Sequence, residues 1–389
     1  MATKISRRRI MATEIKSGSD EVVKIPDLNE DVVIIILSKL PVKSLMRFKC
    51  VCKSWYSLIS SPILVAMHFN DRNRHKNYLA FVGGGRIITS LSIPFLSYHT
   101  MQISSSLSQQ FDDAHFIGLC NGLLCVVVNE LTFCIINPAT KESKVLKEPN
   151  MPFESPSYGF AFDSKANDYK LVRATIQKTE VLTLKSNSWR SILMTDHSIR
   201  VMQEVRTLVD LWSNAVMKNT LHWIGLRSRV KTKVIVAFDL VHEEFREIKI
   251  PDQPNSSDLL STVRHHCFVF QDCLSITISY GLHPDRKIEV WVMKEYGVEG
   301  SWTKQYCFST STHDLSVQKI FSFIRLGTNG DWPFRSSNDP LTLSSAFSTK
   351  ESFFDNIKLH PDLGGRTINY TETLVPIDRK EEDQYLFGW

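Results

Sequence analysis

The sequence lacks an apolar run long enough to cross a membrane. The longest one near the N-terminus, residues 32–37, has six residues, whereas a membrane-spanning helix needs about 20. The first twenty residues also lack the apolar core of a secretory signal. We therefore expect no membrane partner and a location in the reducing cytoplasm, with the basic triplet at 7–9 leaving the nucleus open as a second location.

The net charge is also low. The 46 Lys and Arg residues against 41 Asp and Glu give +5 at pH 7. The whole excess lies in residues 1–66, where 11 basic residues meet six acidic ones, because residues 67–389 hold 35 of each. A nucleic-acid-binding protein more often carries a basic face on its large domain. We therefore expect no nucleic-acid partner.

Cysteine pairs of the C-x-x-C type are missing among the eight cysteines. Several cysteines lie inside apolar runs such as 123–126, so we interpret them as small buried thiols. His265, His266, Cys267 and Cys273 form the one group of metal-capable side chains close in sequence. Zinc would need a second ligand pair at loop spacing, so we predict neither a metal nor a cofactor.

Common catalytic and phosphate-binding motifs are missing as well. The sequence contains no G-x-S-x-G, no H-E-x-x-H, no P-loop and no G-x-G-x-x-G. The triplet Gly83-Gly84-Gly85 lacks the Lys and Ser/Thr of a phosphate-binding loop, so it is interpreted as a loop. A Ser-His-Asp or Cys-His site assembled from distant loops stays open at this point. No catalytic residue is predicted.

What the sequence does contain is an ordinary globular composition, with 43% hydrophobic and 22% charged residues. Residues 1–23 are polar and aperiodic, which predicts a disordered tail, and the repeated Met-Ala-Thr leaves Met11 open as a second start. Asp27 followed by Glu30 predicts a helix cap, and Pro41 is expected to end that first helix. Beyond it, a stripe at helical spacing is formed by Leu45, Phe48, Cys52, Trp55 and Ile59.

After about residue 75 the pattern changes to short β-branched and aromatic runs separated by turn residues, which is typical of an all-β domain. One strand-turn-strand unit recurs, and its markers Asn137, Thr183, Asp239 and Val292 lie 46, 56 and 53 residues apart. A degenerate further copy is placed at 355–359. This spacing predicts the blades of a β-propeller, and a β-sandwich stays open as the alternative.

Two sets of motifs point to a known family. The helical set is Leu28-Asn29-Glu30-Asp31-Val32-Val33, Leu40-Pro41-Val42-Lys43-Ser44-Leu45 and Arg47-Phe48-Lys49-Cys50-Val51-Cys52-Lys53-Ser54-Trp55. The β set is Gly118–Cys125, Asn137–Thr140, Tyr158–Phe160, Asp168–Val172 and Ile288–Met293. The first resembles the F-box of plant F-box proteins, and the second is similar to their F-box-associated domain, a kelch-like propeller.

The resemblance implies a fold class and a domain division. The fold is a small all-α F-box followed by an all-β kelch-like β-propeller. The expected parts are a tail at 1–23, the F-box at 24–66, the propeller at 67–376 and a C-terminal tail at 377–389.

The resemblance also implies a function. Such a chain is the substrate-recognition subunit of an SCF-type ubiquitin ligase: its F-box binds a Skp-type adaptor, which is held by a cullin that carries the RING subunit. Carried over by position, the adaptor contacts are Leu28, Val32, Leu40, Pro41, Val42, Leu45, Val51 and Trp55. Two positions depart from the family pattern, Asn29 where Pro is usual and Val32 where Leu is usual, which bears on adaptor affinity.

The substrate would be a protein marked for proteasomal degradation, bound by loops of the propeller. The irregular segments 70–115, 194–215, 251–264 and 309–350 are the candidates, with Trp212 and Trp332 as anchors. The alternative for each Trp is packing under its own loop. The resemblance extends to S-locus F-box proteins, which would make the substrate a secreted pistil S-ribonuclease in self-incompatibility. Other readings are a receptor for another plant developmental or defence protein, and a propeller scaffold without ligase function.

Overall fold

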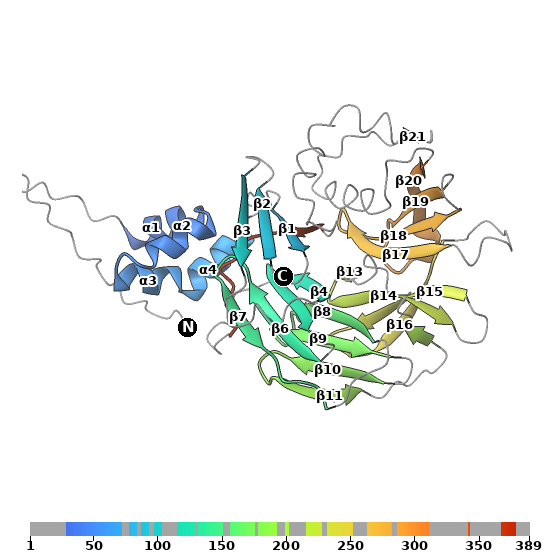
Figure 1. Ribbon diagram of the computed structural model, residues 1–389, viewed down its shortest axis with the longest axis horizontal. Helices are drawn as coiled ribbons and strands as arrows, with labels where there is room; N and C mark the ends of the chain where they lie inside the picture. The colour runs from blue at the N-terminus through green and yellow to red at the C-terminus, as the bar shows by residue number, and fades with distance from the viewer. Residues whose placement is uncertain are drawn as a thin grey trace, which may run out of the picture.

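The structure is a computed structural model (Figure 1). It describes residues 29–71, 78–83, 87–92, 97–102, 115–128, 131–150, 156–175, 178–192, 199–201, 215–227, 232–251, 263–281, 286–310, 341–342 and 367–378. Within these ranges no helix is both long and apolar enough to cross a bilayer.

Four helices come first in the chain. They are α1 (Glu30–Ser38), α2 (Val42–Phe48), α3 (Lys53–Ile59) and α4 (Pro62–Asn70). Helix α1 begins after Asn29, whose side chain accepts a hydrogen bond from the N–H of Asp31 at 3.1 Å. The cap predicted at Asp27 is therefore wrong in position, since Asn29 satisfies a free N–H of the first turn.

The stripe predicted beyond Pro41 is divided between α2 and α3. Cys52 has extended backbone angles (φ −158°, ψ 166°) just before α3, so the chain leaves helical geometry there. Leu45 and Ile59 are buried as expected, whereas Cys52 is exposed. The two helices pack together through Phe48 and Trp55, whose ring centroids lie 5.2 Å apart in an edge-to-face arrangement.

The rest of the described chain forms five sheets, here called blades I to V. Blade I has the strand order β22 (Thr367–Tyr370), β1 (Tyr78–Gly83), β2 (Ile87–Ser92) and β3 (Ser97–Gln102). Blade II consists of β4 (His115–Cys120), β5 (Leu123–Val128), β6 (Thr132–Asn137) and β7 (Glu142–Val145). Blade III consists of β8 (Ser157–Asp163), β9 (Asp168–Ala174), β10 (Thr179–Thr183) and β11 (Ser188–Ile192).

Blades IV and V follow the same meander. Blade IV consists of β12 (Ile199–Val201) and β13 (Ala215–Met217), which pair with the same edge of β14 (Thr220–Arg227), then β15 (Thr232–Asp239) and β16 (Phe245–Lys249). Blade V consists of β17 (Arg264–Phe270), β18 (Cys273–Tyr280), β19 (Arg286–Met293), β20 (Trp302–Thr310) and the short β21 (Leu341–Thr342). A 3-10 turn, η5 (Glu299–Ser301), precedes β20.

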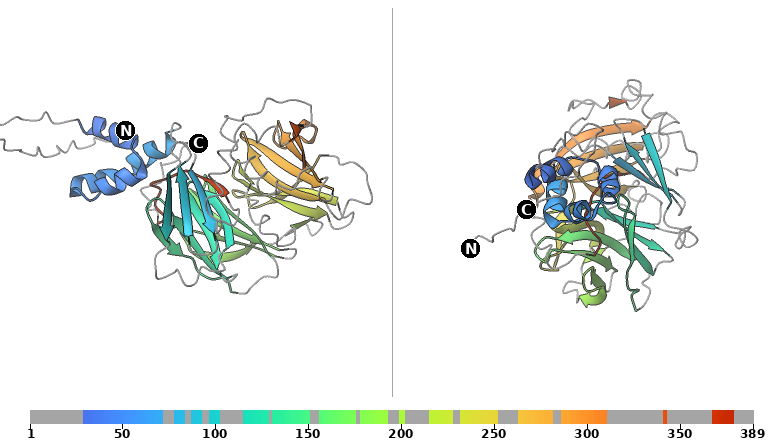
Figure 2. Two further views of the ribbon diagram at one scale, coloured as in Figure 1. Left: turned by 45° about the horizontal axis from the view of Figure 1, so that its top comes forward. Right: turned by 90° about the vertical axis from the view of Figure 1, so that its left-hand side faces the viewer.

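The blades follow one another around a common centre (Figures 1 and 2). Neighbouring blades contact one another through strands at the start of each meander, since β4 lies against β8, β8 against β14, and both β13 and β14 against β17. The markers Asn137, Thr183, Asp239 and Val292 all fall at or near the end of the third strand of successive blades. The propeller prediction is confirmed and the sandwich alternative is wrong, whereas the copy expected at 355–359 lies outside the described residues.

Tight turns join the first and second strands of each blade from II to V. Asn121-Gly122, Lys218-Asn219 and Gln271-Asp272 are two-residue turns in which both residues have positive φ, the type I′ geometry that suits twisted hairpins. In blade III the turn has four residues, and Asp163 accepts hydrogen bonds from two N–H groups within it, at 2.9 and 3.0 Å. These turns fix the pairing of the first and second strands in each of these blades.

The third and fourth strands of blades II, III and IV are also joined by similar turns. Lys141, Asn187 and Glu243 take positive φ there and donate their N–H to the residue four positions earlier, at 2.8 to 2.9 Å. In blades III and V a Trp stands near the start of the fourth strand. Trp189 Nε1 donates to the carbonyl of Lys147 at 2.7 Å, and Trp302 Nε1 donates to that of Lys249 at 2.9 Å. Each Trp therefore reaches back to the preceding blade, which explains the recurring aromatic position.

Apolar residues fill the spaces between neighbouring blades. Strand β15 shows the principle, because its side chains alternate between two cores: Val234, Val236 and Phe238 pack toward blade III, while Ile235 and Ala237 pack toward blade V. Both faces of this strand are buried, so it has the continuous apolar pattern of an interior strand.

The ends of the propeller are brought together by pairing of the last described strand, β22, with the first, β1. After β22 the chain continues as residues 371–378, here called the C-terminal strap. Within it Leu374, Val375 and Ile377 are buried. The strap extends past the domain boundary drawn at 376, and α4 likewise crosses the boundary drawn at 66, since it ends at Asn70.

Candidate functional site

The helical region exposes one apolar face of α1. Val32, Ile35 and Ile36 are 41%, 51% and 50% exposed, and their spacing of three and four residues places them side by side on the helix surface. On other faces Leu37 is buried, with Val33 and others packed against the same core. A helix with apolar residues all round needs a second surface to cover it.

Further apolar side chains of the helical region are exposed at Val51, Tyr56, Ile63 and Met67. With the three residues of α1 they are called the helical apolar residues. Among the described residues nine large hydrophobics are exposed, and seven of them belong to this set, the others being Val145 and Val298 on the propeller. Such a concentration of apolar side chains is typical of a protein-binding surface.

The predicted adaptor contacts fall into four groups. Val32, Pro41 and Val51 are exposed, Leu40 and Trp55 are half-buried against the core, and Leu28 lies outside the described residues. Val42 and Leu45 are 1% and 0% exposed. Val42 and Leu45 are therefore core residues of this chain, and their contact with an adaptor stays a prediction.

Five exposed residues escaped the sequence prediction, namely Ile35, Ile36, Tyr56, Ile63 and Met67. For α1 the signal was present, because six consecutive apolar residues in a nine-residue helix cannot all face one core. Helix α4 carries a similar run at 63–67, whereas α3 has none.

The two cysteines of the helical region are exposed, in contrast to the prediction of buried thiols. Cys50 and Cys52 are exposed, Cys125, Cys134 and Cys267 are buried, and the other three are intermediate. The hydroxyl of Ser54, 3.1 Å from the Cys52 sulfur, lowers the pKa of that thiol. The apolar runs of the β domain correctly predicted the burial of Cys125, Cys134 and Cys267. Cys52 lies at the break between α2 and α3 and does not reach the core.

The strap contacts the propeller at the end that carries the short turns. In a four-stranded meander the turns after the first and third strands lie at one end, and the connection to the next blade leaves from the other. At the short-turn end, Gly122 approaches Thr371 and Thr373 of the strap so closely that an added Cβ would lie 2.4 Å from the Thr373 methyl. The longer connections, such as 146–156 and 250–263, join strand ends at the opposite end.

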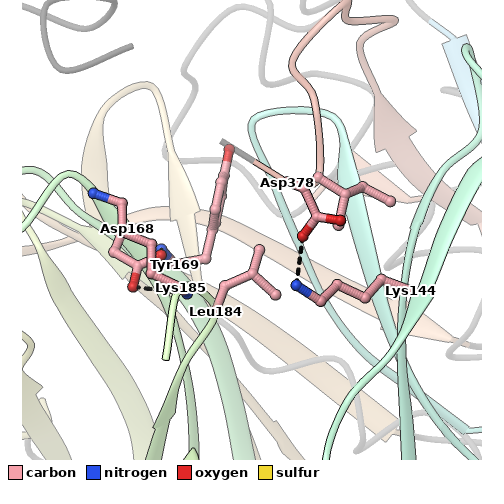
Figure 3. Close-up of a pocket in the computed structure, with 7 residues that line it drawn as sticks. Lys144, Asp168, Tyr169, Leu184, Lys185 and Asp378 are labelled. Carbon is pink, nitrogen blue, oxygen red and sulfur yellow. Dashed lines mark hydrogen bonds and ion pairs between the residues drawn. The ribbon is translucent and has the colours of Figure 1, made fainter. Parts of the chain in front are cut away.

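A pocket of about 220 Å³ lies where the strap meets blades II and III (Figure 3). Lys144 and Asp378 form an ion pair of 2.5 Å across one wall. On the other wall Asp168 accepts the N–H groups of Tyr169 at 2.8 Å and Lys185 at 3.1 Å. Its main charges are thus engaged within the chain, and the pocket carries no candidate reaction.

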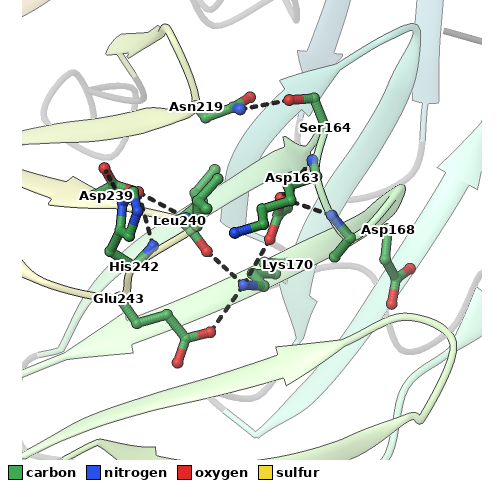
Figure 4. Close-up of polar contacts among 12 residues, drawn as sticks. Asp163, Ser164, Asp168, Lys170, Asn219, Asp239, Leu240, His242 and Glu243 are labelled. Carbon is green, nitrogen blue, oxygen red and sulfur yellow. Dashed lines mark hydrogen bonds and ion pairs between the residues drawn. The ribbon is translucent and has the colours of Figure 1, made fainter. Parts of the chain in front are cut away.

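A buried ionic cluster joins blades III and IV (Figure 4). The Lys170 ammonium lies 2.8 Å from Asp163 and 2.8 Å from Glu243, and it also donates to the carbonyl of Leu240. Arg190 pairs with Glu243 as well. Burial acts to raise the pKa of Glu243, but hydrogen bonds from Arg190 and Lys170 outweigh it, and the pKa is lowered. This cluster is a structural link between blades.

The metal-capable residues close in sequence lie on two strands: His265, His266 and Cys267 in β17, and Cys273 at the start of β18. His265 lies 3.2 Å from Lys233 Nζ, while the Cys267 thiol donates to the carbonyl of His222 at 3.4 Å. Burial, with the Lys233 charge, lowers the pKa of His265 to about 3. Across the described ranges, no group of three or more His, Cys, Asp or Glu is placed to hold a metal ion.

The predicted substrate anchors Trp212 and Trp332 both lie outside the described residues, as do most of the four candidate segments. Their role stays a prediction.

Comparison with known proteins agrees with this architecture. The F-box domain profile matches residues 25–66, and the profile of the F-box associated beta propeller domain matches residues 78–334. Four helices with an uncovered apolar surface, followed by a propeller, define the class: the chain belongs to the F-box proteins with an F-box-associated β-propeller.

Curated relatives from Arabidopsis thaliana match this chain over most of its length and most of their own. F-box protein At3g07870 is 27% identical over 80% of this chain and 79% of its own. F-box protein CPR1 is 26% identical over 76% of this chain and 75% of its own. F-box/kelch-repeat protein At3g23880 is 28% identical over 75% of this chain and 79% of its own. The combination of F-box and propeller is consistent with a substrate adaptor of an SCF ligase.

Proposed function

We propose that this chain is the substrate-recognition subunit of an SCF-type ubiquitin ligase. The observation that carries the proposal is the set of helical apolar residues, which remain exposed in a segment that matches the F-box. The Skp-type adaptor would cover this surface, and the cullin and RING subunit would join through the adaptor. Each apolar side chain buried there would contribute on the order of 1.5–3 kcal/mol.

The adaptor contacts that we propose are the exposed ones. Val32, Pro41 and Val51 remain from the predicted set, and Ile35 and Ile36 join them because they share the α1 face with Val32. Asn29 caps α1, so the position where the family usually has Pro still starts the helix.

The substrate is proposed to bind at the end of the propeller from which the long connections leave. That end lies opposite the short turns, of which the one at Gly122 contacts the strap. A substrate there would face away from the adaptor-binding helices, and loops at this end can vary without disturbing the packed blades. The chain itself would make or break no bond: its role is to raise the local concentration of substrate lysines near the ubiquitin donor.

A pull-down with a plant Skp-type adaptor tests the proposal. The variant Ile35→Glu/Ile36→Glu places charge on the exposed α1 face and should lose the adaptor. Val298→Glu is the matched control, because Val298 is 48% exposed but lies on blade V. Equal retention of the adaptor by both folded variants would reject this surface as the docking site.

The narrower role of a pollen S-locus factor rests on the resemblance alone. It predicts selective binding of S-ribonucleases over other secreted basic proteins. An array of purified S-ribonucleases presented to the intact chain tests it, and binding of none would favour another plant developmental or defence protein as substrate.

A further inference from the structure

The C-terminal strap is attached to blade II through one buried side chain. Asn137 is fully buried at the end of β6, and its Nδ2 donates to the carbonyls of Thr373 at 3.2 Å and Val375 at 2.9 Å. Its Oδ1 accepts the N–H groups of Ala139 and Thr140. All the hydrogen-bonding capacity of this amide NH₂ group is therefore directed at the strap.

The strap also belongs to the core beneath the helices. Its apolar residues Leu374, Val375 and Ile377 lie in one continuous cluster with buried residues of α1 to α4 and of blades II and III, among them Leu37, Leu58, Leu64 and Phe133. Figures 1 and 2 show the strap beside β7, at the base of α4.

Two further contacts fix this junction. Lys144 of β7 pairs with Asp378 at the end of the strap. Near the end of α2, burial lowers the pKa of Lys49 while the charge of Glu142 in β7 acts to raise it, so the helices and blade II face each other here. The strap thus lies at a junction of three parts rather than at a free chain end.

We propose that the strap is a clamp that sets the orientation of the helical region on the propeller, with Asn137 as its positioning residue. The inference rests on the proposed ligase function for its consequence. A fixed orientation determines which lysines of a bound protein lie near the ubiquitin donor, because transfer depends strongly on geometry. The covalent link between α4 and β1 is short and consists of residues 72–77, so the strap provides a second attachment between the helices and the propeller.

The first experiment measures the orientation in the chain alone. Fluorophores are placed by unnatural amino acids at Ser57 on α3 and Lys287 on β19, both exposed, and the distance distribution is recorded by single-molecule energy transfer. A chain that stops after Tyr370 lacks the strap but keeps β22, and it should show a broadened distribution. A chain that stops after Asp378 keeps the strap and should match the full-length protein.

A point variant keeps the test decisive if the shortened chain fails to fold. Asn137→Ala removes the two bonds to the strap and should broaden the same distribution. Asn187→Gly is its control, since the Asn187 side chain accepts the Lys147 N–H at 2.9 Å rather than bonding a group of the strap. An unchanged distribution in folded Asn137→Ala would overturn the clamp.

The second experiment reads the consequence. The full chain is assembled with adaptor, cullin and RING subunit, and the lysines of the chain that become ubiquitinated are mapped by mass spectrometry. The intact chain should be modified at a restricted set of lysines, and Asn137→Ala at a wider set with adaptor affinity unchanged. Because the distance measurement needs no adaptor, failure of the ligase function and failure of the clamp give different results.

Discussion

Lys170 in β9 forms a 2.8 Å ion pair with Glu243, which lies 73 positions later in the turn before β16. The same ammonium group contacts Asp163 at 2.8 Å, and both Lys170 and Asp163 are almost fully buried. One ammonium group therefore contacts two carboxylates from successive blades, and Arg190 supplies the second positive charge at Glu243. The arrangement links blades III and IV on the end of the propeller that carries the short turns.

Replacing Lys170 should be costly. Lys170→Met leaves the buried Asp163 carboxylate without its cation, and removal of one partner of a buried pair typically lowers the free energy of unfolding by about 3–5 kcal/mol. Urea unfolding followed by circular dichroism measures the loss. Lys249→Met breaks the exposed pair with Glu299 and should cost less than about 1 kcal/mol. Similar losses in the two variants would contradict a structural role for the cluster.

Stability should fall as the pH is lowered from 7 to 4.5. Burial lowers the pKa of His222 from 6.5 to about 4, and its ring nitrogens lie 2.7 Å from the Ala215 carbonyl and 2.8 Å from the Tyr296 hydroxyl. Between these two pKa values the unfolded chain binds a proton that the folded chain does not, so the stabilisation present above pH 6.5 is lost on acidification.

For a single histidine this dependence amounts to about 1.4 kcal/mol per pH unit within that window. His222→Gln should reduce the slope of unfolding free energy against pH between 6 and 4.5. Equal slopes for the intact protein and His222→Gln would show that this ring does not titrate as proposed.

Each hydrogen bond from a Trp side chain to the preceding blade should contribute measurably to the free energy of unfolding. Trp302→Phe keeps an aromatic ring but removes the Nε1–H that donates to Lys249 at 2.9 Å. We expect a loss of about 1 kcal/mol in unfolding free energy. Phe245→Tyr is a useful comparison, because Phe245 occupies the same place in blade IV without an N–H donor. A neutral Trp302→Phe variant would reduce the bond to an incidental contact.

Core and surface positions of the F-box should respond differently. Leu45 is fully buried, so Leu45→Ala should lower the unfolding free energy by about 2–5 kcal/mol. Ile36 is half exposed, so Ile36→Ala should leave stability nearly unchanged and weaken adaptor binding. Thermal unfolding and adaptor titration of both variants separate the two roles, and the reverse pattern would contradict our division of the predicted contacts.

Much of the β domain could be predicted from local patterns. In the turns after Asn137 and Asp239, the side chain of the marker residue accepts two backbone N–H groups. The repeat can therefore be recognised from an Asn or Asp at this position. The break between α2 and α3 was missed, because helical spacing continues through Cys52 although the backbone there is extended.

The strap lay beyond sequence reasoning for a different reason. The hydrogen bond between Asn137 and Val375 joins residues 238 positions apart. The sequence near either residue does not indicate that the two are in contact. Exposure has the same limit: the family resemblance implies Val42 and Leu45 as adaptor contacts, and only the packing shows that both side chains are covered by the chain itself.

The most direct test of the account is the dissociation constant of the intact, folded chain for a purified plant Skp-type adaptor, measured by isothermal titration calorimetry. We predict one-to-one binding with a negative heat-capacity change, as expected when an apolar surface is buried. No binding by a chain that is folded by circular dichroism would contradict the ligase-subunit account and favour a propeller scaffold.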